Sequence, residues 1–119
     1  TRTMTTTFTL YVVAHRGVSS EPERVLEATS HPTGIMITVH DSTIRTRSQA
    51  RDERFVAPNV ECAAAMVSRA VGHGLQHEIR VAAPGAAMKE AVSVPIPKDG
   101  VERRAAIDGA VRMLQLTAV

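Results

Sequence analysis

The arginines between positions 43 and 51 have the spacing that most directly suggests chemistry. Arg45, Arg47 and Arg51 are all at odd-numbered positions, so an extended backbone would point all three to one side, with Arg45 and Arg47 about 6.6–7 Å apart. A guanidinium forms paired hydrogen bonds with phosphate or carboxylate groups. We therefore expect these arginines to form an anion-binding surface, and nucleic acid is one candidate partner. A solvated strand face, offset by the acidic residues that follow, is the alternative.

A second group of candidates lies where two predicted strands end. His15 is followed by Arg16, and His40 is followed by Asp41. If the two strands run parallel and are joined by a helix, these residues meet at one edge of the sheet, where open sheets favour ligand sites. A histidine beside a carboxylate can act as a general acid–base pair, with Arg16 orienting an anionic substrate. Local hydrogen bonding in a turn is the alternative for both histidines and for Asp41.

Metal and cofactor chemistry have little support in the sequence. His73 and His77 are four positions apart, but Gly72 and Gly74 break the helix that would bring them together. The single cysteine, Cys62, excludes a paired-cysteine zinc site and an intramolecular disulfide. The glycine-rich motifs of nucleotide-binding loops are missing from the sequence. We therefore expect neither a metal nor a cofactor.

The elements that position these candidates follow from hydrophobic periodicity and from turn and cap signals. They predict the order β-α-β-β-α-β-β-α, which is an α+β fold. We expect a mostly antiparallel sheet with three helices packed on it. The predicted strands cover residues 8–15, 35–39, 43–48, 79–83 and 88–94, and the predicted helices cover 21–29, 60–71 and 100–114.

Each predicted helix has a cap and an apolar stripe. Ser20, Asn59 and Asp99 are residue types that cap helix N-termini, and Ser20 and Asp99 each have a glutamate three positions later. The apolar stripes recur at helical spacing. Their members are Val25, Leu26 and Ala28; Val60, Ala63, Ala64, Val67, Ala70 and Val71; and Ile107, Ala110, Val111 and Leu114.

The chain shows a weak internal repeat. Val-Glu and Ala-Ala pairs recur 41 positions apart, and the helices at 60–71 and 100–114 each follow a two-strand segment. This supports the hypothesis of a duplicated β-β-α unit, although alanine pairs are common in a chain so rich in alanine. We expect residues 1–6 to be a flexible segment and residues 7–119 to form a single α+β domain.

Composition limits the partners. Apolar residues make up 44% and charged residues 22% of the 119 residues, as in ordinary globular domains. Twelve arginines and two lysines against twelve acidic residues give a net charge of +2, which by itself implies neither nucleic acid nor an anionic membrane. No apolar run is long enough to span a membrane, and the N-terminus lacks a signal-peptide pattern. We expect a cytoplasmic protein with no membrane partner.

The thin core suggests self-association. Only three residues are aromatic, Phe8, Tyr11 and Phe55, so the core must be built from smaller side chains that each bury less area. We expect a homo-oligomer, with a two-fold dimer as the favoured form. The sequence thus favours a non-catalytic binding or regulatory protein that presents its arginine face to an anionic partner. A small enzyme that uses His15, His40 and Asp41 is the alternative.

Overall fold

The computed structural model describes residues 7–15, 23–40, 53–71 and 76–115. Six strands form one sheet in the order β4-β3-β2-β1-β5-β6, and every neighbouring pair is antiparallel. The α+β class and the antiparallel sheet are therefore confirmed. The strands are β1 (Thr9–His15), β2 (Glu23–His31), β3 (Gly34–Val39), β4 (Glu53–Ala57), β5 (Gln76–Ala82) and β6 (Val92–Val94).

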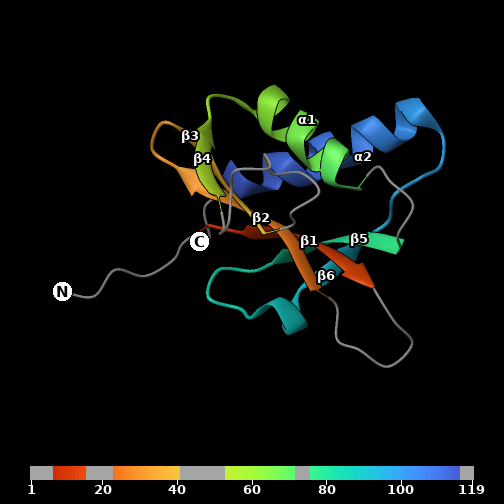
Figure 1. Ribbon diagram of the computed structural model, residues 1–119, viewed down its shortest axis with the longest axis horizontal. Coiled ribbons are helices and arrows are strands. Elements are labelled where there is room, and N and C mark those ends of the chain that lie inside the picture. The colour runs from red at the N-terminus through yellow and green to blue at the C-terminus, as the bar shows by residue number, and fades with distance from the viewer. Residues whose placement is uncertain (1–6, 16–22, 41–52, 72–75, 116–119) are drawn as a thin grey trace.

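Two helices lie side by side on one face of this sheet (Figure 1). They are α1 (Val60–Val71) and α2 (Gly100–Arg112), and α2 continues into a short 3-10 helix, η2 (Met113–Gln115). A second 3-10 helix, η1 (Met88–Glu90), belongs to the segment that packs on the opposite face of the sheet. We call these the helix face and the outer face.

The helix predicted at 21–29 is wrong, because residues 23–31 form strand β2. The reason is a β-bulge. Val12 pairs with Leu26 but Val13 pairs with Arg24, so Val25 is an extra residue in β2. The bulge leaves both Val25 and Leu26 buried, and two adjacent apolar residues followed by Ala28 mimic a helical stripe. Among the described residues there are consequently two long helices, where three were expected.

Two further segments differ from expectation or fall outside the described residues. The strand predicted at 88–94 is shorter, because Met88–Glu90 forms η1 and only Val92–Val94 pairs with β5. Residues 43–48 lie outside the described ranges. In the described parts of the chain two strands precede each long helix, namely β3 and β4 before α1 and β5 and β6 before α2; the duplication itself stays a prediction.

The caps and stripes of α1 and α2 are confirmed. The Asn59 side chain accepts a hydrogen bond from the Cys62 amide at 2.9 Å, and Asp99 accepts one from the Glu102 amide at 3.0 Å. These bonds satisfy amides that the first helical turn leaves without a partner. Every residue of both predicted stripes is buried.

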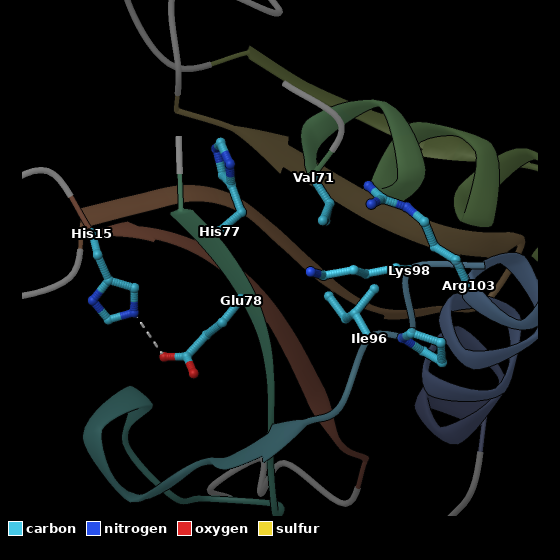
Figure 2. Close-up of a pocket in the computed structure, with 8 residues that line it drawn as sticks. His15, Val71, His77, Glu78, Ile96, Lys98 and Arg103 are labelled. Atoms are coloured by element: carbon cyan, nitrogen blue, oxygen red, sulfur yellow. Dashed lines mark hydrogen bonds and ion pairs between the residues drawn. The ribbon is translucent and has the colours of Figure 1, made fainter. Parts of the chain in front are cut away.

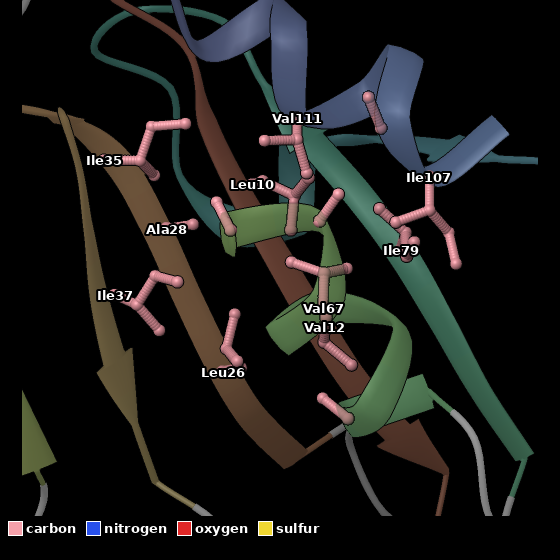
Figure 3. Packing of buried hydrophobic residues seen from close by; sticks show 14 of the residues in the cluster. Leu10, Val12, Leu26, Ala28, Ile35, Ile37, Val67, Ile79, Ile107 and Val111 are labelled. Carbon is pink, nitrogen blue, oxygen red and sulfur yellow. The ribbon is translucent and has the colours of Figure 1, made fainter. Parts of the chain in front are cut away.

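The core fills the space between the helix face and the two helices (Figure 3). Val67 of α1 and Ile107 and Val111 of α2 lie over alternating residues of the sheet. The fully buried sheet residues include Leu10, Val12, Leu26, Ala28, Ile35, Ile37 and Ile79.

Strand β1 is covered on both faces, as its sequence predicts. Tyr11 and Val13 lie on the outer face and pack with Ala82, Ala86 and Met88, from the end of β5 and the segment that contains η1. Apart from the paired residues Met36 and Val56, the remaining described part of the outer face is polar. One row of directly paired residues crosses all six strands there, and its members are Arg54, Thr38, Glu27, Tyr11, Arg80 and Ser93. Among the described residues, no helix has the length and apolar character needed to cross a membrane.

Candidate functional site

A pocket of about 460 Å³ lies at the end of the sheet where β1 finishes and β5 begins (Figure 2). This volume falls within the range of about 300–1,000 Å³ that is typical of small-molecule sites. The described lining residues are His15, Val71, His77, Glu78, Ile96, Pro97, Lys98 and Arg103. They come from β1, α1, β5, the segment after β6 and the first turn of α2.

Local sequence explains how two of the walls form. Proline cannot donate to a strand ladder, so Pro95 and Pro97 end β6 and leave 95–98 free to cross toward the helices. The Asp99 cap then starts α2. As a result Lys98 and Arg103 stand on either side of the helix start, and both line the pocket.

Glu78 is the most heavily engaged side chain of the pocket. Its Oε1 accepts hydrogen bonds from His15 Nε2 at 3.1 Å and from Arg80 Nε at 2.6 Å, and Arg80 Nη2 also lies 2.6 Å from Oε1. The Ser93 hydroxyl donates to the other oxygen, Oε2, at 2.8 Å. Both carboxylate oxygens are thus occupied by donors from three strands.

These contacts set the charge of the carboxyl group. Burial raises the pKa of Glu78, but the hydrogen bonds from Ser93, Arg80 and His15, together with the positive charge of Arg80, outweigh this effect. The pKa of Glu78 therefore lies below its ordinary value of 4.5. Glu78 is ionised at neutral pH, and its charge is balanced by Arg80.

Lys98 and Arg103 differ from Glu78 in having no hydrogen-bond or ion-pair partner among the described residues. Figure 2 shows both charged ends near Val71, on the opposite side of the pocket from His15. Val71, Ile96 and Pro97 are the apolar residues among the described lining. The pocket therefore offers two uncompensated cations beside an apolar wall.

The structure separates the two histidines that the sequence grouped together. β1 and β3 run in the same direction, but β2 lies between them. The two strands are therefore about 10 Å apart. Each histidine has its own acidic neighbour. His15 contacts Glu78, whereas His40 Nε2 lies 3.7 Å from Glu27 Oε2.

Several predicted site residues lie outside the described ranges. They are Arg16, Asp41, Arg45, Arg47 and Arg51. Their proposed roles stay predictions. His77 lines the pocket but is not part of a metal site in the described residues, where no group of three or more histidine, cysteine or acidic side chains could hold a metal ion.

Comparison with protein-family models, curated proteins and solved structures gave no match. The function must therefore be argued from the side chains of this chain alone.

Sequence reasoning missed Glu78, Lys98 and Arg103 as site residues. For Glu78 a signal was present, because Glu78 and Arg80 alternate with the apolar residues Ile79 and Val81 and so had to share the face of β5 opposite the core. For Lys98 and Arg103 the only signal was their position around a predicted helix cap. Their approach to His15 and Glu78 depends on how α2 packs on the sheet.

Proposed function

We propose that the protein binds a small anionic ligand in the pocket lined by Lys98 and Arg103, and that it does so without a chemical step. The observation that carries this proposal is the imbalance of charge in the pocket. The one carboxylate among the described lining residues, Glu78, is already balanced by Arg80, while Lys98 and Arg103 have no described partner. An anion that enters the pocket would supply the missing partner for both cations.

The position of His15 favours binding over catalysis. An ionised carboxylate only accepts hydrogen bonds. Nε2 of His15 therefore carries the hydrogen and donates a hydrogen bond to Glu78. Figure 2 shows the other ring nitrogen on the side facing away from Lys98 and Arg103. In this orientation neither nitrogen is aimed at a ligand held by the two cations, as a general base would have to be.

A titration followed by amide NMR spectra tests the proposal. Inorganic phosphate or citrate is added at low ionic strength, and we expect saturable shifts centred on His77, Lys98 and Arg103. The affinity should weaken as sodium chloride is raised, because the attraction is electrostatic. Replacing both cations, Lys98→Glu with Arg103→Glu, should abolish the saturable shifts.

The matched control is the pair Lys89→Glu with Arg104→Glu. It makes the same change in net charge at two exposed positions outside the pocket. We expect this control variant to keep most of the affinity. An equal loss in both double variants would mean that only net charge matters, and it would contradict a site in the pocket.

The sequence supports a second, wider anionic contact and self-association. Alternation of Arg45, Arg47 and Arg51 favours a basic surface for nucleic acid, and loss of oligonucleotide binding in Arg45→Glu with Arg47→Glu would support it. The exposed Val101, 80% accessible, is consistent with a homodimer. Sedimentation equilibrium at micromolar concentration tests this, since a mass near 12.8 kDa would contradict it.

A further inference from the structure

We infer that the ligand of the pocket is a phosphate monoester of a small apolar molecule. This inference rests on the proposed anion-binding function and narrows it to one chemical class. It concerns the head group that Lys98 and Arg103 would hold and the body that would lie against the apolar wall.

The head group is argued from the two cations. Lys98 and Arg103 are five positions apart and line the same pocket, and both side chains extend toward Val71 (Figure 2). Two cations that line one pocket can both be matched by two negative charges on one group. A phosphate monoester carries about 1.5 to 2 negative charges at pH 7 on three acceptor oxygens, whereas a single carboxylate carries one charge on two oxygens.

The types of the two cations agree with this assignment. A guanidinium binds two phosphate oxygens at once through its planar fork, and an ammonium is a compact charge that can contact a third oxygen. Glu78 does not oppose an anion at this place, because Arg80 and Ser93 already engage its two oxygens. The Glu78 carboxylate also lies on the same side of the pocket as His15, away from Arg103 (Figure 2).

The body of the ligand is argued from the apolar wall and from the volume. Val71, Ile96 and Pro97 line the pocket together with Lys98. A cavity of about 460 Å³ has room beyond a phosphate group for a small organic body, which would gain free energy by covering apolar surface. Inorganic phosphate would fill the cationic part only.

Isothermal titration calorimetry with three probes tests the inference on the full chain. The probes are phenyl phosphate, inorganic phosphate and benzoate, at constant ionic strength and pH 7.5. We expect phenyl phosphate to bind at least tenfold more tightly than either of the others. Arg103→Gln and Lys98→Gln should each weaken the binding of phenyl phosphate at least tenfold. Arg104→Gln and Lys89→Gln remove the same charge outside the pocket and should change the affinity less than twofold.

Each other outcome is informative. If benzoate binds as tightly as phenyl phosphate and is lost in the same two variants, the pocket binds anions but the phosphate inference is overturned. If inorganic phosphate binds as tightly as phenyl phosphate, the inference that the ligand has an apolar body is overturned. If no probe binds, or if binding is unaffected by Lys98→Gln and Arg103→Gln, both this inference and the proposed function fail. If only an oligonucleotide binds, and this binding is lost in Arg45→Glu with Arg47→Glu, the phosphate monoester inference is also overturned.

Discussion

His15 Nε2 lies 3.1 Å from Glu78 Oε1, although 63 positions separate the two residues in the sequence. The contact joins the end of β1 to the beginning of β5 on the outer face of the sheet. Arg80 and Ser93 bind the same carboxylate, so Glu78 connects three neighbouring strands. The stability of the protein and the shape of the pocket therefore both depend on the Glu78 side chain.

Replacing Glu78 with glutamine should destabilise the protein by about 1–3 kcal/mol. The substitution removes charge-assisted hydrogen bonds and leaves Arg80, whose side chain is only 20% exposed, without its counter-charge. Urea unfolding followed by circular dichroism measures the change. Glu90→Gln is the control, since Glu90 is exposed and lies outside this network, and it should stay within about 0.5 kcal/mol of the wild type.

The contribution of Glu78 should also depend on pH in a defined direction. Its pKa in the folded protein is below the ordinary value of 4.5, so the unfolded chain binds the proton more readily. The stabilisation is therefore complete above about pH 5 and is lost as the pH falls through the folded pKa. The difference in unfolding free energy between the wild type and Glu78→Gln should be constant from pH 5 to 7 and shrink below pH 5; a difference that grows on acidification would contradict this.

Gly34 should not tolerate a side chain. A Cβ atom at this position would overlap the carbonyl oxygen of Ala57 on the neighbouring strand β4. Gly34→Ala must then push β3 and β4 apart, at a cost of about 3 kcal/mol. Gly109→Ala is the matched control, because a Cβ there meets open space within α2, and we expect it to stabilise the protein by about 0.5–1 kcal/mol. Thermal unfolding of both variants checks the opposite signs.

The features that could be predicted from the sequence are those that depend on local spacing. The stripe from Val60 to Val71 and the caps Asn59 and Asp99 are determined within one helix, and all of them are confirmed. The segment 21–29 could not be predicted in this way. Its burial pattern depends on a bulge that exists only because β2 pairs with β1, and that pairing is a long-range property.

The site was predictable only in part for the same reason. His15 was expected at the end of a strand and is found there, at the edge of the pocket. The carboxylate expected at this site was Asp41, which follows His40 and lies outside the described residues. The structure instead places Glu78 beside His15. The position of Lys98 and Arg103 opposite this pair follows from the packing of α2 against α1 and the sheet, which no local pattern encodes.

A final prediction follows from the bulge in β2 and would not hold for a regular strand. Val25→Ala should cost about 2 kcal/mol and Leu26→Ala about 2–5 kcal/mol, because both side chains are at most 1% exposed. In a regular strand adjacent side chains point to opposite faces, so only one of the two substitutions would leave a cavity in the main core. Val92→Ala makes the same chemical change as Val25→Ala at a side chain that is 71% exposed, and it should change the unfolding free energy by less than about 0.5 kcal/mol. If Val25→Ala proved as harmless as Val92→Ala in urea unfolding, the extra residue would not point into the core, and the pairing of β1 with β2 would have to be revised.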